Sequence, residues 1–311
     1  MKDFNEKLRD AAKKGAEAEL KTLLLLPTLN ALSTDELGIT ALMQAAHHGR
    51  AACVQLLLPV SNPLATDCRG TTALMRAAAY GTAACVQLLL PVSDAGAKNN
   101  GGSTSLMHAA TKGHAECLKL LLPASNAGAT DKNGATAMMR AASCGHADCL
   151  ELLLPASDAR AVTNNGMTAL MYAAFNGSDE CAQLLLAASD ALAVTNDGMT
   201  ALMYAAFNGH ARCAQLLLPA SDIMSKDHLG LTALMHAASD GHAQCVRLLL
   251  PVSALGVRND EGMTASEYAM NKGRPEIGDI IDAYALAQSE LSALSSLTVS
   301  GPPRKTPSRR V

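Results

Sequence analysis

The sequence contains no tryptophan and few aromatic residues of any kind. Phenylalanine and tyrosine make up 3% of its 311 residues, whereas hydrophobic residues as a whole make up 49%, largely alanine and leucine. Small and aliphatic side chains suit thin helical layers better than one large core. The composition therefore argues against the two or three globular domains that the length alone would favour.

An excess of charge and long apolar runs are missing as well. The net charge is −3 at pH 7, so no strong field draws the whole chain to nucleic acid or acidic lipid. The leucine triplets are too short to span a bilayer, and the N-terminal segment lacks the apolar stretch of a secretory signal. We expect an intracellular, monomeric protein without membrane association, cytoplasmic although a nuclear location is also compatible.

One formula recurs along the chain at a fixed spacing of 32 residues. It reads G-x-T-A-L-M-x-A-A-x-x-G-x-x-x-C-x-x-L-L-L-P and is followed by a polar stretch. Strict spacing without insertions is typical of units that stack on their neighbours in one register. The first glycine of the formula stands at Gly38, Gly70, Gly102, Gly134, Gly166, Gly198, Gly230 and Gly262.

Each unit is predicted to form two short helices. A threonine two residues after the first glycine precedes the Ala-Leu-Met run, as an N-cap should. A second glycine such as Gly81 ends this helix. The second helix places a cysteine and two leucines on one face, for example Cys117, Leu120 and Leu121. A proline such as Pro123 then closes it, because the residue before proline is disfavoured in the helical region.

These motifs resemble the ankyrin repeat family over about residues 5 to 293. Thr-Ala-Leu-Met stands where that family shows Thr-Pro-Leu-His, within a unit of roughly 33 residues. The resemblance implies an all-α solenoid of stacked helix-turn-helix units with short β-turn or hairpin-like connections. The present unit is one residue shorter, which affects the pitch of the stack. Apolar packing should also replace the family histidine's hydrogen bonds, because that position holds Met43, Met75, Met107, Met139, Met171, Met203 and Met235.

The two ends of the chain depart from the formula. We interpret residues 1–37 as an N-terminal capping repeat, 38–261 as seven in-phase repeats and 262–293 as a degenerate C-terminal capping repeat. Thr264 and Glu267 form a capping box there, and Pro275 can open a longer final helix. Residues 294–311 are basic and rich in proline and serine, so we predict a disordered tail. The final helix has one apolar face made by Ile277, Ile280, Ile281, Tyr284 and Leu291.

The cysteines and histidines are better explained by structure than by chemistry. Seven of the nine cysteines recur at one position. Stacked helices lie about 8–10 Å apart, too far for a disulfide, so these cysteines should be buried core residues. The stretch "SCGHADC" lacks the second cluster that a zinc site needs. We expect no metal, cofactor or catalytic residue, with a metal or thiol enzyme as the disfavoured alternative, and a turn-bracing role for His114, His146, His210 and His242.

The positions that the formula leaves free carry six of the eight aromatic residues. In the resembling family, first helices and turn tips line a concave surface, and here this implies a basic half from Arg76 to Arg140 and an aromatic patch beyond it. Tyrosine and arginine are enriched in interface hot spots. The candidate partner-binding residues are Arg76, Tyr80, His108, Lys112, Arg140, Tyr172, Phe175, Asn176, Tyr204, Phe207, Asn208 and His236.

We therefore predict a non-enzymatic protein-binding module, acting as an adaptor or scaffold. Two alternatives stay open. The aromatic residues of the doubled "MYAAFNG" can instead pack on each other between neighbouring units, without binding a partner. The basic tail at 294–311 can instead bind nucleic acid or an acidic partner, although the acidic body makes nucleic acid the weaker choice.

Overall fold

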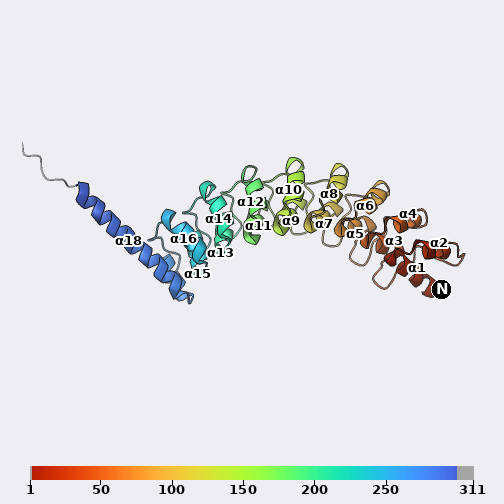
Figure 1. The fold of residues 1–311 in the computed structure, drawn as a ribbon, viewed down its shortest axis with the longest axis horizontal. Helices are drawn as coiled ribbons and strands as arrows, with labels where there is room; N and C mark the ends of the chain where they lie inside the picture. Colours follow the sequence, from red (N-terminus) through yellow and green to blue (C-terminus); the bar gives the residue numbers. More distant parts are fainter. Residues whose placement is uncertain (1, 300–311) are drawn as a thin grey trace, which may run out of the picture.

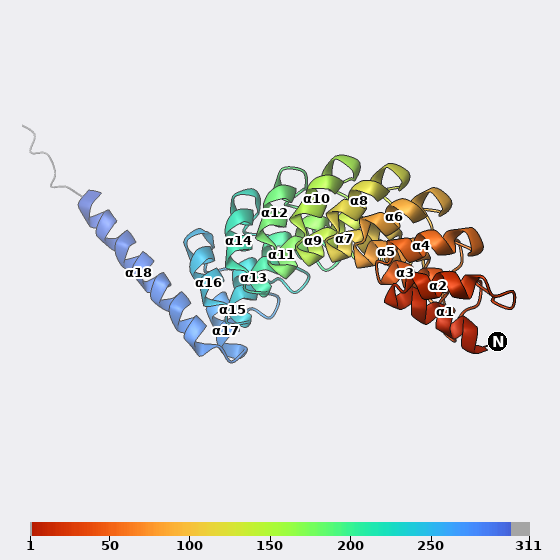
Figure 2. The ribbon, with the colours of Figure 1, turned by 45° about the vertical axis from the view of Figure 1, so that its right-hand side comes forward.

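Helix pairs follow one another in single file and form an arc (Figures 1 and 2). The computed structural model describes residues 2–299, with side chains placed for residues 4–293. Within that range it contains eighteen α-helices and no strand. The helices that carry Cys53 and Cys245 lie near opposite ends of the arc (Figure 1). The prediction of an all-α stack of units is confirmed.

Each unit contributes one helix to an inner row and one to an outer, convex row (Figure 2). The N-terminal pair is α1 (Lys2–Lys14) and α2 (Glu17–Leu24). The first helices of the later units are α3 (Ala41–His47), α5 (Ala73–Tyr80), α7 (Ser105–Lys112), α9 (Ala137–Cys144), α11 (Ala169–Asn176), α13 (Ala201–Phe207), α15 (Ala233–Ser239) and α17 (Ala265–Asn271). The second helices are α4 (Ala51–Leu57), α6 (Ala83–Leu89), α8 (Ala115–Leu121), α10 (Ala147–Leu153), α12 (Asp179–Leu186), α14 (Ala211–Leu217), α16 (Ala243–Leu249) and the final α18 (Pro275–Val299).

Threonine caps the first helices, as predicted. Thr72 Oγ1 accepts a hydrogen bond from the Met75 amide at 3.2 Å, and the other units repeat this contact. The methionines of the motif are buried, as expected for apolar packing. In two units the sulfur also accepts a hydrogen bond, because the amides of Thr168 and Thr200 donate to the Sδ atoms of the methionines three residues on, at 3.4 and 3.5 Å.

Proline closes the second helix differently from the prediction. Leu58, which precedes Pro59, stays in the right-handed helical region at φ −52° and ψ −44°. The chain then makes a 3₁₀ turn over Leu58–Val60 before Ser61 becomes extended. Proline is tolerated in a first helical turn because its missing N–H would have no partner there. Ala187 replaces proline after α12, which continues through Leu186 without such a turn.

Two kinds of hydrogen bond join neighbouring units, one at the turn tips and one at four of the junctions. At the turn tips, the Cys68 amide donates to the Leu37 carbonyl at 2.8 Å, and the same backbone bond recurs at each later junction through Asp260 to Leu229. At the other end, Nε2 of His114 lies 3.1 Å from the Ala79 carbonyl of the preceding unit. His146, His210 and His242 make the equivalent contact. The turn-bracing role predicted for these histidines is confirmed.

The C-terminal cap has the predicted features and a longer helix than expected. Thr264 and Glu267 form the capping box, and α18 begins at Pro275. The helix runs to Val299, six residues beyond the expected boundary at 293. Its beginning packs on α17 and α16, whereas Leu291 is 59% exposed where α18 extends beyond the arc (Figure 1). The tail at 300–311 lies outside the described residues.

Replacing Gly177 with alanine should destabilise the stack. Gly177 has φ +69°, and an added Cβ would lie 2.5 Å from Nδ1 of His210 in the next unit. Left-handed backbone at alanine costs about 1–2 kcal/mol, and displacing the brace adds to it. Urea unfolding followed by circular dichroism should therefore show a lower midpoint.

The matched control is Gly256→Ala. An added Cβ at Gly256 meets nothing within 4 Å, so the urea midpoint should stay constant or rise slightly. Equal midpoints for Gly177→Ala and Gly256→Ala would show that the left-handed turn does not contribute to stability.

Candidate partner-binding surface

In five units, the residue directly after the methionine of the motif contacts a turn residue nine positions earlier. Arg76 Nη2 lies 2.6 Å from Asp67 Oδ2, and Asn99 Nδ2 lies 3.3 Å from His108 Nε2. Three further pairs follow the same spacing: Arg140 with Asp131, Tyr204 with Thr195, and His236 with Asp227. Five of the side chains predicted to contact a partner therefore have an internal partner in the turn that precedes their own helix.

The turn residue holds the turn together at the same time. Asp67 Oδ1 accepts hydrogen bonds from the amides of Arg69 and Thr71, both at 2.8 Å. Burial alone would raise the pKa of Asp67, but these amides and the Arg76 guanidinium outweigh it and hold that pKa below its ordinary value. Asp131 has a lowered pKa for the same reasons. Each aspartate thus joins its turn to the helix that follows.

The residues at the ends of the first helices are more exposed. Phe175 and Phe207 are each 40% exposed and Tyr80 is 50% exposed. Phe175 makes an edge-to-face contact with Tyr204 of the next unit, with ring centroids 5.8 Å apart. Phe207 packs in the same way on His236, also at 5.8 Å. The rings therefore pack between units and still offer apolar surface to solvent.

The remaining predicted residues lie around these rings. Tyr172 is half-buried, and Lys112 is exposed. Asn176 Nδ2 donates to the Tyr172 carbonyl at 3.0 Å, and Asn208 Nδ2 donates to the Tyr204 carbonyl at 3.1 Å. The two asparagines thus satisfy carbonyls near the ends of their own helices.

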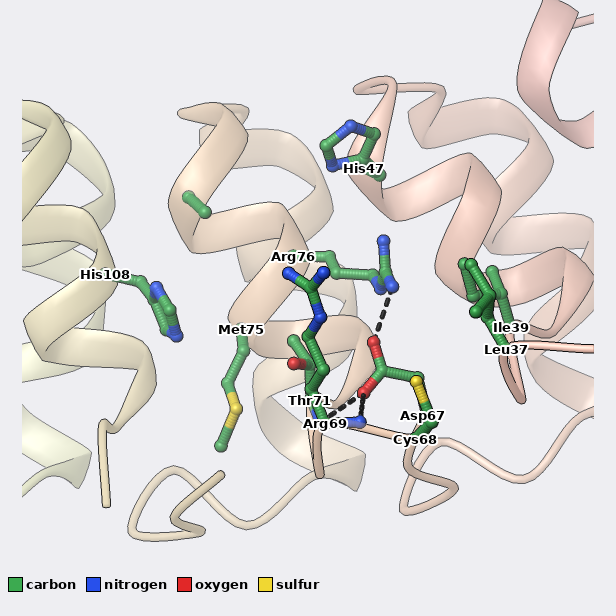
Figure 3. A pocket seen from close by; sticks show the side chains of 11 residues that line it. Leu37, Ile39, His47, Asp67, Cys68, Arg69, Thr71, Met75, Arg76 and His108 are labelled. Atoms are coloured by element: carbon green, nitrogen blue, oxygen red, sulfur yellow. Dashed lines mark hydrogen bonds and ion pairs between the residues drawn. The ribbon is translucent and has the colours of Figure 1, made fainter. Parts of the chain in front are cut away.

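A pocket of about 380 Å³ opens at the N-terminal end of the surface (Figure 3). The turns before α3 and α5 and the helices α3, α5 and α7 surround it. Of its lining residues, Arg76 and His108 are among the candidate partner-binding residues predicted from the sequence. The lining also includes Leu37, Ile39, His47, Asp67, Cys68, Arg69, Thr71, Met75 and Ala79.

The seven cysteines at the repeated position are core residues, as predicted. All nine are free, and the seven at the repeated position are buried. Burial raises the pKa of Cys85, Cys117, Cys149, Cys181 and Cys245 to about 11, which disfavours the reactive thiolate. Residues 2–299 contain no group of three or more potential metal-ligating side chains, and His146 of "SCGHADC" contacts the Thr111 carbonyl instead.

The fold is that of a helical repeat protein. A family model described as ankyrin repeats (3 copies) matches residues 8–100, 74–165, 155–227 and 219–281. The chain belongs to the ankyrin repeat family. Ankyrin repeats generally mediate protein–protein interactions and are typically not enzymes. No curated protein matches the chain. Within the part of the chain that the structure describes, no helix combines the length and apolar character needed to cross a membrane.

Exchanging one internal pair for another should restore much of the stability that breaking the first pair removes. Asp67→Asn alone leaves the Arg76 guanidinium without its carboxylate and should cost about 1–3 kcal/mol. The double change Asp67→Asn/Arg76→His reproduces the Asn99–His108 pair of the next unit, so it should recover at least half of that loss. Urea unfolding of the single and double variants measures the coupling. Losses that simply add would contradict the pairing.

Acid should weaken the N-terminal units as their histidines become protonated. Burial, then Arg76 and Lys13, lowers the pKa of His47, and burial with Arg140 and Lys112 lowers that of His108. The unfolded chain, with histidine pKa values near 6.5, then binds more protons than the folded one. Stability is therefore complete above about pH 6.5 and declines as pH falls below it.

The decline is measured by urea unfolding between pH 7.5 and 5. We expect His47→Gln/His108→Gln to make it shallower than in the wild type. An unchanged decline in this double variant would show that other groups govern the acid response.

Proposed function

We propose that the chain is a non-enzymatic adaptor that holds an exposed segment of a partner protein on its concave surface. The single observation that carries this proposal is the exposure of Phe175 and Phe207, each 40% accessible in a chain with only eight aromatic residues. Aromatic side chains contribute strongly at interfaces because they bury a large area with few rotatable bonds. They lie at the ends of α11 and α13, the inner-row helices of adjacent units.

The stack supports binding by preorganisation. The turn residues and the histidine braces fix the first helices before any partner arrives, so little conformational entropy is lost on binding. The nine free cysteines suit a reducing compartment, and we propose that the protein acts as a monomer in the cytoplasm.

Removing the exposed rings should strongly reduce partner capture and only moderately reduce stability. For Phe175→Ala/Phe207→Ala we expect a loss of about 1–3 kcal/mol in unfolding free energy, because each ring is only partly buried, and a severalfold loss of captured partner. Affinity capture with quantitative mass spectrometry, beside urea unfolding, measures both effects.

The control is Leu192→Ala, which removes an exposed apolar side chain from a loop. It should leave capture unchanged. If the double phenylalanine variant lost stability but retained the same interactors at wild-type levels, the aromatic patch would serve packing alone.

A further inference from the structure

The pocket at the N-terminal end of the concave surface combines aliphatic walls with two arginines. Leu37 and Ile39 precede α3, and Met75 belongs to α5 (Figure 3). The Arg69 and Arg76 side chains both line the same space. An aliphatic side chain fits such walls, and an anion fits such arginines.

Both arginines retain hydrogen-bonding capacity. Arg76 is bound to Asp67 through Nη2, but its buried Nε has no hydrogen-bond partner within the described residues. Arg69 is exposed, and its side chain has no hydrogen bond or ion pair in that same part of the chain. Asp67 is already engaged by Arg76 and two amides. The pair of arginines therefore keeps one uncompensated positive charge.

Positive charge extends along this half of the surface and gives way to negative charge further on. Lys112 and Lys132 are exposed at the end of α7 and in the turn before α9. The later turn tips carry Asp197, Asp260 and Glu261 instead. Glu36 lies on the turn before α3 but does not line the pocket. An extended partner should thus lie with its acidic part towards the N-terminal units.

We propose that this pocket binds an acidic residue flanked by an aliphatic one in the partner segment. The carboxylate contacts Arg69 beside the partly buried Arg76 guanidinium, and the aliphatic side chain packs against Leu37 and Ile39. The inference rests on the proposed function, because it names the partner chemistry of one end of the same surface. Aliphatic walls favour a carboxylate beside an apolar residue over a phosphate, which lacks an apolar part.

A phage-displayed library of random peptides selected on the full-length chain tests this directly. Peptides recovered on the wild type should be enriched in aspartate or glutamate next to leucine, isoleucine, valine or methionine. The best peptide is then synthesised with a fluorophore, and its Kd is measured by fluorescence anisotropy. Arg69→Gln should weaken its binding about tenfold, as expected for loss of one charge-assisted hydrogen bond. Added salt should weaken wild-type binding more than that of the variant.

The matched control is Arg247→Gln, the same change at an exposed arginine of the outer helix α16. It should leave the Kd unchanged. Because Arg69 is exposed, Arg69→Gln should keep the wild-type urea midpoint, which separates lost binding from lost folding.

The remaining outcomes overturn the proposal in distinguishable ways. Peptides without acidic enrichment, or with equal affinity for Arg69→Gln, would refute the pocket. If the same peptides bound more weakly to Phe175→Ala/Phe207→Ala, the proposed function would survive that failure. Tighter binding when phosphoserine replaces the acidic residue would assign the pocket to phosphate instead. Failure to recover any peptide on the wild-type chain would count against both the pocket and the proposed function.

Discussion

The structure depends on the fact that one unit cannot bury its own apolar face. Each face is covered only when the neighbouring unit stacks on it in the same orientation. The unbroken spacing of 32 residues makes this possible, because every junction then places a turn amide opposite a turn carbonyl, as Cys68 meets Leu37. The histidine brace joins neighbouring units at the opposite end of the first helices. The continuous core, the arc and the surface formed by the inner-row helices all follow from this regular spacing.

The regular spacing also places the free side chains of the inner-row helices in two groups, according to their position in the unit. Those after the motif methionine, such as Arg76 and Tyr204, contact the turns that precede their own helices and stabilise those turns. Those near the helix ends, such as Phe175 and Phe207, pack on the next unit and still face solvent. We therefore propose recognition at the helix ends and in the N-terminal pocket, where apolar surface and uncompensated charge remain.

Much of the fold could be predicted because its signals are local and recur in successive units. Threonine caps, left-handed glycines and the Gly-His brace each follow from residues a few positions apart. The internal pairs were missed although their signal is present. Aspartate accompanies arginine, asparagine accompanies histidine and threonine accompanies tyrosine at a constant spacing of nine. Recognising these pairs requires knowing that the turn folds back on the helix that follows it.

Two other features exceed what local patterns can indicate. The rule for residues before proline describes a preference, and Leu58 shows that a 3₁₀ turn can override it. The apolar face of α18 predicts a helix but does not show where its covering neighbours end, so the exposure of Leu291 became visible only in three dimensions. The pocket was hidden for a similar reason, because its walls come from four units.

The near-identity of the units beginning at Met167 and Met199 has a consequence for how such a chain changes length. Each junction involves only adjacent modules, so excising or duplicating one whole module recreates a junction of the same kind. Recombination between the two similar stretches would remove or add one copy of the aromatic motif that carries Phe175 or Phe207, while leaving the N-terminal pocket intact. The length of the aromatic patch can therefore change in discrete steps, independently of the N-terminal pocket.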